Sequence, residues 1–165
     1  MALNLQRLKI VVADDSKQMR SVLLGFLNAL NITNIREAKD ADEAWDLINL
    51  FNPDLLITDW NMAPTSGLAL IKRVRTAPES TNRFLPIIMV TAYNEEHRVI
   101  EARNAGITEF LLKPVTAAAF FDRVMAVVED DREFVETSSF FGPDRRRGQR
   151  PTYGGPERRG SGGRP

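Results

Sequence analysis

Apolar and polar positions follow a regular pattern over the first 128 residues, where short apolar runs precede longer stretches with apolar residues three and four positions apart. Short apolar runs are typical of buried parallel strands, and the longer spacing is typical of one helix face. The pattern predicts strands at 8–13, 32–38, 54–58, 84–90 and 108–112. It predicts helices at 19–30, 44–51, 68–74, 95–104 and 115–128.

Local signals support these boundaries. Asp15 or Ser16 can cap the first helix, and Asp40 can cap the second. Pro86 should lie near the start of the fourth strand because it has no amide hydrogen, and Gly106 should close the fourth helix. Five strand–helix repeats with short, right-handed connections require a parallel sheet. The sequence therefore predicts a doubly wound α/β domain with helices on both faces of a five-stranded parallel sheet.

The composition narrows the class of protein. The chain has 165 residues, of which 43% are hydrophobic and 27% charged, as in ordinary globular proteins. It contains no cysteine, which excludes disulfides and thiolate metal sites. The first residues do not resemble a signal peptide, and no apolar run reaches the roughly 18–20 residues that a membrane helix needs. We expect a cytoplasmic protein without membrane insertion.

Polar residues of a few kinds stand at the ends of the predicted strands. Asp14 and Asp15 follow the first strand, Asp59 ends the third, Thr91 follows the fourth and Lys113 follows the fifth. Each residue alone is more typical of a helix cap or a surface charge. Because the carboxyl ends of parallel strands open on one rim, where such sheets bind ligands, we expect the five side chains to converge. Their conjunction favours a functional site.

The residue types indicate the chemistry of this site. Three neighbouring carboxylates repel one another unless a cation neutralises them. Oxygen ligands suit Mg²⁺, which takes one or two carboxylates and several waters. Lys113 and Thr91 remain to bind an incoming anion as a point charge and a hydroxyl donor. We interpret the set as a site for phosphoryl transfer onto Asp59, a reaction that depends mostly on positioning and charge neutralisation.

Four segments carry a resemblance to a known family. They are Val11–Asp15, Ile57–Met62, Val90–Ala92 and Phe110–Pro114. These segments resemble the receiver domain of bacterial two-component response regulators, especially the stand-alone chemotaxis-type receivers. The resemblance extends over about 7–128. It implies a flavodoxin-like sheet with strand order 2-1-3-4-5, and we assign 1–128 to a receiver domain.

The resemblance implies roles for the acidic residues. Asp59 would accept a phosphoryl group from the phosphohistidine of a histidine kinase or a histidine phosphotransfer protein. Asp15, Asp59 and the backbone carbonyl of Asn61 would hold Mg²⁺, and Asp14 would act through a bound water.

The resemblance also implies a switch. Lys113 would bind one phosphoryl oxygen, and Thr91 would move to bond another, which would let Phe110 turn inward. Phe110 has no tyrosine hydroxyl, so its switch would depend on packing. The Lys113–Pro114 peptide bond is expected to be cis.

The resemblance also implies that Asn61 and Tyr93 lie at two positions whose side chains tune the rate at which the phosphoryl group is lost. A ring at Tyr93 would obstruct the attacking water, so we expect a long-lived phosphorylated state. The loop after Asp59 has Pro64 one residue after the position, here Ala63, where the family often has proline. This displacement alters the loop without changing its length.

In receivers, phosphorylation biases a two-state equilibrium that is read on the fourth helix, fifth strand and fifth helix. The resemblance implies a stand-alone regulator, not a dedicated enzyme, whose output is contact with a downstream target protein. We expect self-phosphorylation from a phosphodonor, self-dephosphorylation, and a monomer or a phosphorylation-dependent dimer. The implied output face contains His97, Arg98, Glu101, Ala105 and Phe110.

The chain changes character after residue 128. A helical pattern continues over 129–139, which we interpret as an extension of the last helix. Residues 140–165 hold seven arginines and two acidic residues, a net charge of +5, whereas 1–139 hold 15 basic and 20 acidic residues, a net charge of −5. Glycine, proline and arginine without apolar periodicity predict a disordered tail.

This tail repeats one motif, Gly-Pro-acid-Arg-Arg, at 142–146 and again at 155–159, behind an aromatic pair. A solvated tail is the plain interpretation, and a docking motif is the functional one. We rank an acidic protein surface above nucleic acid as the target, because the interspersed acids weaken phosphate binding. The candidate docking residues are Phe140, Phe141, Arg145, Arg146, Arg158 and Arg159.

Other functions remain open on the sequence alone. The regulator could act as a phosphate sink or a relay in a phosphorelay. An aspartyl-phosphate phosphohydrolase generally needs an acid two residues after its nucleophile, where this chain has Asn61. A flavin or nucleotide carrier would need a glycine-rich loop after the first strand, where this chain has Asp14 and Asp15.

Overall fold

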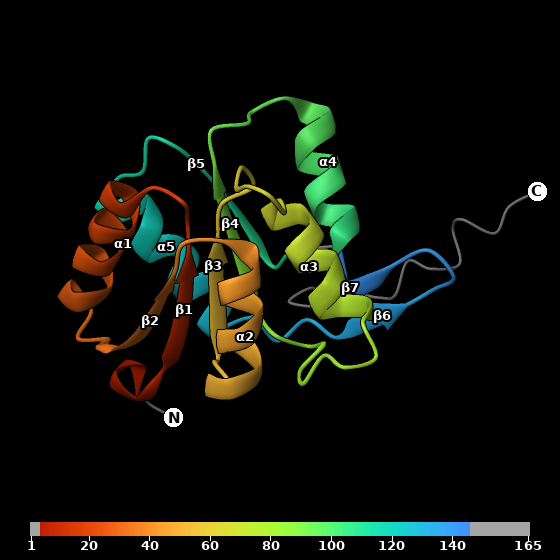
Figure 1. Cartoon of the computed structure of the whole chain (residues 1–165), viewed down its shortest axis with the longest axis horizontal. Helices are drawn as coiled ribbons and strands as arrows, with labels where there is room; N and C mark the ends of the chain where they lie inside the picture. The colour runs from red at the N-terminus through yellow and green to blue at the C-terminus, as the bar shows by residue number, and fades with distance from the viewer. Residues whose placement is uncertain (1–3, 146–165) are drawn as a thin grey trace, which may run out of the picture.

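The computed structural model describes residues 4–145. A short 3-10 helix, Leu5–Arg7, precedes a series of alternating strands and helices (Figure 1). The strands are β1 Lys9–Ala13, β2 Asn34–Ala38, β3 Leu55–Thr58, β4 Ile87–Thr91, β5 Glu109–Leu112, β6 Phe134–Glu136 and β7 Phe141–Pro143. The helices are α1 Lys17–Ala29, α2 Ala41–Phe51, α3 Gly67–Thr76, α4 Glu96–Ala105 and α5 Ala117–Val128.

The first five strands form one parallel sheet in the order β2-β1-β3-β4-β5. This confirms the predicted fold class and strand order. Ala13 pairs with Thr58, and Thr91 pairs with Leu112, so the carboxyl ends of the strands are level with one another. The residues that follow these strands therefore start from one rim of the sheet.

Two layers of helices cover the sheet (Figure 1). On one face, Leu23 and Leu27 of α1 pack with Phe120 and Val124 of α5. On the other face, side chains of α2, α3 and α4 form a second apolar cluster with Val11, Leu56 and Met89 of the sheet. Because both faces are covered, the central strands are apolar throughout instead of alternating.

The helix and strand ends agree with the local signals in the sequence. The Ser16 hydroxyl accepts the amide hydrogen of Met19, so Ser16 is the cap of α1, and Asp40 caps α2 in the same way through Glu43. Gly106 ends α4 with a φ of 100°, in the left-handed region that favours glycine. Pro86 directly precedes β4, as predicted.

The prediction that 129–139 extend the last helix is wrong. Helix α5 ends at Val128, and β6 and β7 form an antiparallel hairpin. The Asp130 carboxylate accepts both the backbone amide and the guanidinium of Arg132, which replaces helical hydrogen bonds locally. The predicted tail also begins too early, because 140–145 are described and include β7, while 146–165 lie outside the described residues.

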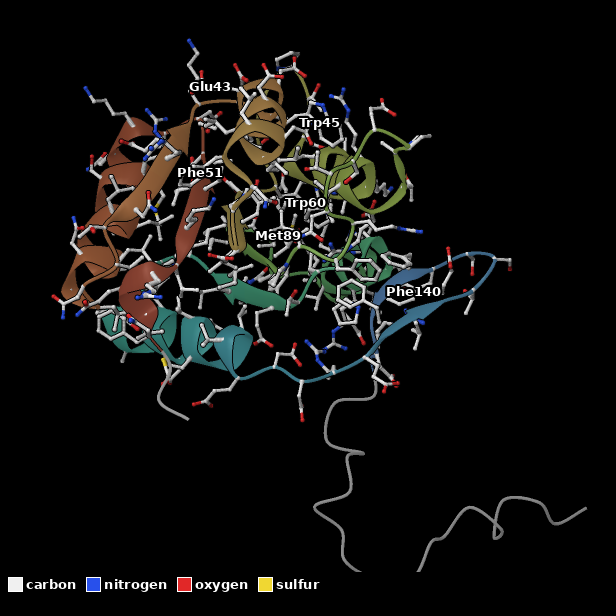
Figure 2. The ribbon with its side chains drawn as sticks, turned by 90° about the horizontal axis from the view of Figure 1, so that it is seen from below. Glu43, Trp45, Phe51, Trp60, Met89 and Phe140 are labelled. Atoms are coloured by element: carbon white, nitrogen blue, oxygen red, sulfur yellow. The ribbon has the colours of Figure 1, made fainter. Side chains whose placement is uncertain are left out.

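Aromatic and glycine contacts hold the hairpin against the domain. The rings of Phe84, Phe134 and Phe141 lie with centroids 5.2–5.4 Å apart. A Cβ added to Gly142 would lie 2.7 Å from the Cα of Gly106, so the two backbones approach closely. Figure 2 shows Trp60 and Met89 inside the main body and Phe140 beside the hairpin. The hairpin is thus a packed addition to the five-stranded unit.

Arg75 of α3 connects this region to the core. Its side chain is 1% exposed and donates to the carbonyl of Gly106 through Nε, at 3.0 Å, and Nη2, at 2.8 Å. Its Nη1 donates to the carbonyl of Arg83, and its guanidinium lies 5.0 Å from the ring of Phe134. Burial, with repulsion from Arg83, lowers the pKa of Arg75 to about 9, so Arg75 is still protonated at neutral pH.

Candidate functional site

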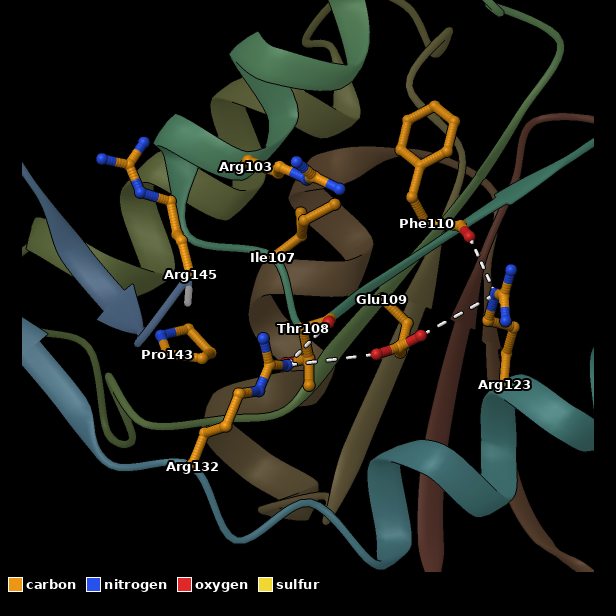
Figure 3. Close-up of a pocket in the computed structure, with 9 residues that line it drawn as sticks. All are labelled: Arg103, Ile107, Thr108, Glu109, Phe110, Arg123, Arg132, Pro143 and Arg145. Carbon is orange, nitrogen blue, oxygen red and sulfur yellow. Dashed lines mark hydrogen bonds and ion pairs between the residues drawn. The ribbon is translucent and has the colours of Figure 1, made fainter. Parts of the chain in front are cut away.

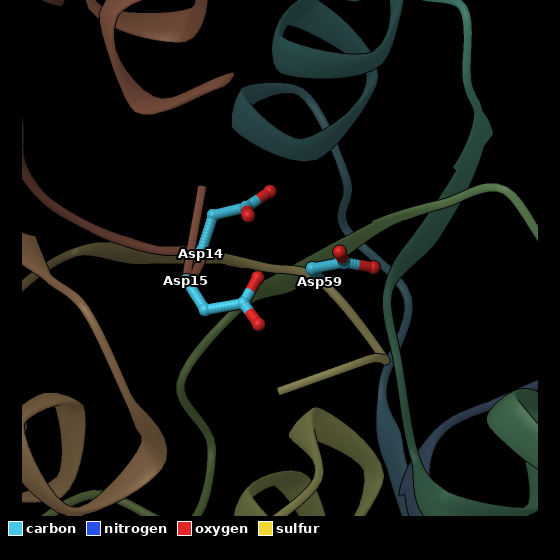
Figure 4. A group of neighbouring side chains, drawn as sticks. All are labelled: Asp14, Asp15 and Asp59. Atoms are coloured by element: carbon cyan, nitrogen blue, oxygen red, sulfur yellow. The ribbon is translucent and has the colours of Figure 1, made fainter. Parts of the chain in front are cut away.

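Three carboxylates meet at the carboxyl ends of β1 and β3 (Figure 4). Asp14 and Asp15 follow β1 directly, and Asp59 follows β3. One oxygen from each lies within 4.8 Å of the others. Asp14 is 1% exposed and Asp59 6% exposed, whereas Asp15 is open to solvent. The predicted acidic cluster is therefore present, with two buried members and one exposed member.

Lys113 reaches this cluster from the end of β5. Its Nζ lies 3.0 Å from Oδ2 of Asp59 and 3.2 Å from Oδ2 of Asp14. The Lys113 amide donates to the carbonyl of Thr91, which fixes the start of the loop, and the Lys113–Pro114 bond is cis as expected. Strands β1, β3 and β5 thus each contribute a charge to one site.

The electrostatics of this group are coupled. Burial raises the pKa of Asp14, and the charge of Asp59 raises it further, while the Ser16 amide and Lys113 oppose the rise. Burial lowers the pKa of Lys113, but its hydrogen bonds and charge interactions with Asp59 and Asp14 outweigh burial and raise that pKa. Lys113 is consequently a cation held by two carboxylates.

Thr91 and Asn61 lie near the carboxyl ends of β4 and β3. Thr91 ends β4, is 1% exposed, and accepts the amide hydrogen of Tyr93 at 3.3 Å through its hydroxyl. The Asn61 amide donates to Oδ1 of Asp59 at 3.3 Å. The Thr58 hydroxyl donates to the backbone carbonyl of Asp59. Asp59 is therefore oriented by these backbone and hydroxyl contacts as well as by its contact with Lys113.

Gly67 sets the position of Asp59 through a contact that the sequence interpretation missed. The Gly67 amide donates to the carbonyl of Trp60 at 2.8 Å. A Cβ on Gly67 would lie 1.7 Å from the backbone oxygen of Asp59, so the backbone at Asp59 lies where a side chain would otherwise be. The signal in the sequence was a glycine at a helix entry, where a residue with higher helix propensity is more usual.

An aromatic and cationic stack flanks the site. The rings of Trp60 and Tyr93 meet edge to face with centroids 5.6 Å apart. The guanidinium of Arg98 lies 5.1 Å from the Trp60 ring and 4.7 Å from the Tyr93 ring. Arg98 was predicted only as an output residue. Its side chain also joins α4 to Trp60 and Tyr93, which lie one residue after Asp59 and two residues after Thr91, and its output role stays a prediction.

The other predicted output residues differ in their surroundings. His97 is exposed, and Glu101 and Phe110 are partly buried. Ala105 is 6% exposed and packs in the apolar cluster between the helices and the sheet. Its methyl group therefore faces the core and offers little surface to a partner, and its place on the output face stays a prediction.

The predicted docking residues of the tail are only partly within the described residues. Phe141 packs against Phe84 and Phe134, so it is engaged by the domain itself. Phe140 lies under the guanidinium of Arg145, which also donates to the side-chain carbonyl of Asn104. The remaining candidates, Arg146, Arg158 and Arg159, lie outside the described residues.

The acidic cluster fits a divalent cation. Its donors are carboxylate oxygens, which magnesium prefers, and their mutual distances allow one ion to contact more than one of them. Asp15 is exposed and so leaves a path for an ion with its waters. Among the helices of residues 4–145, none has the length and apolar character needed to cross a membrane.

Comparisons with known proteins agree with this geometry. The family model described as "Response regulator receiver domain" matches residues 10–125, which ends before the hairpin. "Chemotaxis protein CheY" of Pseudomonas aeruginosa is 34% identical over 122 residues, which cover 74% of this chain and 97% of the relative. A "Chemotaxis protein CheY homolog" of Campylobacter jejuni is 38% identical over 123 residues, covering 73% and 92%.

Solved structures give the same result for the fold. The structure of Vibrio cholerae chemotaxis protein CheY4 superposes with a TM-score of 0.67 at 27% sequence identity. The superposition covers 73% of this chain and 98% of that protein. The receiver domain of a Francisella response regulator aligns with a TM-score of 0.66 at 29% identity, covering 74% and 97%.

Proposed function

This chain belongs to the response regulator receiver domain family, and on that premise we propose that Asp59 accepts a phosphoryl group. The donor is the phosphohistidine of a histidine kinase or a histidine phosphotransfer protein. The observation that carries the proposal is the contact of Lys113 with both Asp59, at 3.0 Å, and Asp14, at 3.2 Å, beside Asp15. Such a group suits phosphoryl transfer, where positioning and charge neutralisation supply most of the catalysis.

In the proposed step, a carboxylate oxygen of Asp59 attacks the phosphorus atom. The bond between phosphorus and the donor imidazole nitrogen breaks, and its electron pair stays on that nitrogen. Lys113 turns from the two carboxylates to the phosphoryl oxygens and holds the added negative charge. Asp15, Asp59 and the backbone carbonyl of Asn61 would hold Mg²⁺, with Asp14 acting through a water, and the ion would supply further charge neutralisation.

The output follows from Thr91 and Phe110. The Thr91 hydroxyl leaves the Tyr93 amide, with which it now bonds, and donates to a phosphoryl oxygen. Phe110 is partly buried against the helical layer and turns inward as Thr91 moves. The change is read by a downstream protein on the face formed by α4, β5 and α5, which includes His97 and Glu101.

The test is phosphorylation by acetyl phosphate with Mg²⁺, followed by intact-mass spectrometry. We expect one added phosphoryl group in the wild type and none in Asp59→Asn. Asp46→Asn, which changes an exposed aspartate of α2, is the matched control and keeps the modification. Modification of Asp59→Asn to the wild-type extent would contradict the proposal.

A phosphate sink or relay is the second candidate, because the same site would serve it without an output partner. Transfer of the phosphoryl group back to a histidine phosphotransfer protein distinguishes it from an output device. Turnover of p-nitrophenyl phosphate without a kinase would favour a phosphohydrolase. We expect no turnover, since Asn61 replaces the second acid that such enzymes need.

A further inference from the structure

A pocket of about 290 Å³ lies at the amino end of β5, away from the Lys113 end (Figure 3). Its walls come from α4, β5, α5, the segment after α5, and β7. The hairpin therefore closes one side of a surface that α4, β5 and α5 form together. Four of the residues that line it are arginines: Arg103, Arg123, Arg132 and Arg145.

Two of these arginines are held at the inner wall. Glu109 is 8% exposed, and its carboxylate lies 3.7 Å from Nε of Arg123 and 4.0 Å from Nη2 of Arg132. Arg132 also donates to the carbonyl of Thr108 and pairs with Asp130 at 2.6 Å. These contacts fix the orientation of the two guanidinium groups, and the carboxylates of Glu109 and Asp130 balance their charges.

The other two arginines stand at the rim. Arg103 and Arg145 are both exposed, and Arg145 is held by the side-chain carbonyl of Asn104 and the ring of Phe140. The four lining arginines carry a charge of +4, and Glu109 of the lining and Asp130, which pairs with Arg132, reduce the net charge of this group to +2. The rim arginines therefore supply charge that the described carboxylates of the pocket do not balance.

We propose that this pocket binds carboxylate side chains from an acidic segment of a partner protein. Guanidinium groups bind carboxylates through paired, planar hydrogen bonds, and the excess charge is positive. The apolar walls at Ile107, Phe110 and Pro143 suit the aliphatic stems of glutamate side chains. A nucleic acid binds through an extended series of phosphate contacts, whereas this is one small pocket containing a buried carboxylate.

The inference rests on the proposed function, because it names the class of partner that the output face takes. Phe110 belongs to both sites: it lines the pocket, and it is the residue that turns inward on phosphorylation. Inward rotation would remove its ring from the pocket wall. Phosphorylation at Asp59 would thereby alter the pocket at the amino end of β5 through the movement of Phe110.

The test is isothermal titration calorimetry of the full chain with a short glutamate-rich peptide, with a glutamine-rich peptide of equal length, and with a single-stranded oligonucleotide. We expect the glutamate-rich peptide alone to bind the wild type. The double variant Arg103→Gln/Arg145→Gln should bind it at least about tenfold more weakly, or about 1.4 kcal/mol. The matched control is Arg7→Gln/Lys72→Gln, which removes the same charge from two exposed side chains outside the pocket and should stay within about twofold of the wild type.

Three outcomes would overturn the inference: no binding of the glutamate-rich peptide at low salt, equal loss in the control variant, or tighter binding of the oligonucleotide through the same arginines. Acetyl phosphate labelling of each variant separates this inference from the proposed function. If Asp59 is labelled normally but the wild type does not prefer the glutamate-rich peptide to the glutamine-rich one, the pocket proposal alone is rejected. If the wild type is not labelled, the receiver function is rejected.

Discussion

At the scale of single residues, Lys113 and Gly67 act on Asp59 in different ways. Lys113 supplies a charge that two carboxylates share, and Gly67 supplies space for the backbone of Asp59. The first role was predictable, because a lysine at the end of a parallel strand faces the common rim. The second was not, because the sequence does not show that two backbone segments approach within the radius of a methyl group.

Tyr93 controls the lifetime of the phosphorylated state in our interpretation. Its ring stands against Trp60 and under Arg98, at the edge of the site. Tyr93→Ala should speed loss of the phosphoryl group by about three- to tenfold, because water gains access to the phosphorus atom. Tyr93→Phe keeps the ring and should leave the decay unchanged. The rates can be followed by mass spectrometry after removal of the donor, and slower or equal decay in Tyr93→Ala would reject the idea.

At the scale of elements, the sequence predicted the five strand–helix units correctly but not the hairpin after them. Apolar residues at three- and four-residue spacing and clear caps such as Ser16 and Asp40 define the helices of the receiver unit. After Val128, the acidic and aromatic residues show neither a regular apolar spacing nor a clear cap. Their structure depends on partners distant in sequence, such as Phe84 for Phe134 and Gly106 for Gly142.

Gly142→Ala tests the packing of the hairpin. The added Cβ would lie 2.7 Å from the Cα of Gly106 and 2.9 Å from the Phe140 ring, so the backbones must move apart. We expect the free energy of unfolding to fall by about 1–3 kcal/mol in urea titrations. Gly25→Ala, in α1 with nothing within 4 Å of the new Cβ, is the control and should raise stability by up to about 1 kcal/mol. Equal stability of Gly142→Ala and the wild type would show that the hairpin is not held there.

At the scale of the whole molecule, the charged groups of the site connect strands that are not neighbours. Strand β5 stands two places from β3 and three places from β1 in the sheet, yet Lys113 contacts carboxylates that follow both. The convergence of these groups was predictable from topology alone. The arginine pocket was not, because it needs the hairpin to bring Pro143 and Arg145 beside α4.

Removing the contacts of Lys113 with Asp14 and Asp59 should lower the stability of the whole protein, and magnesium should restore it. In Lys113→Met, Asp14 and Asp59 repel each other without a cation, so the free energy of unfolding should fall by about 1–3 kcal/mol. Magnesium at 100 times its dissociation constant should add about 2.7 kcal/mol to a protein that binds it only when folded. Lys72→Met, at an exposed position of α3, is the control and should change little.

The deficit of Lys113→Met should shrink in acid. Burial raises the pKa of Asp14, so its neutral form is favoured in the folded protein, and the resulting stability is lost as the pH rises through that raised pKa. Lowering the pH towards 3.8, the ordinary pKa of an aspartate, therefore protonates Asp14 and relieves the repulsion. Thermal unfolding between neutral and acid pH measures this, and a deficit that grows in acid would contradict the coupling.

Gly67 has a consequence for how this chain can vary in evolution or in design. Any side chain there would start 1.7 Å from the Asp59 carbonyl oxygen, and neighbouring side chains cannot make room by changing rotamer because the obstacle is backbone. Diversity in the loop after Asp59 must instead come from exposed positions such as Ala63 and Pro64. A combinatorial library that randomises those two residues and keeps position 67 as glycine would change what approaches Asp59 without displacing Asp59 itself.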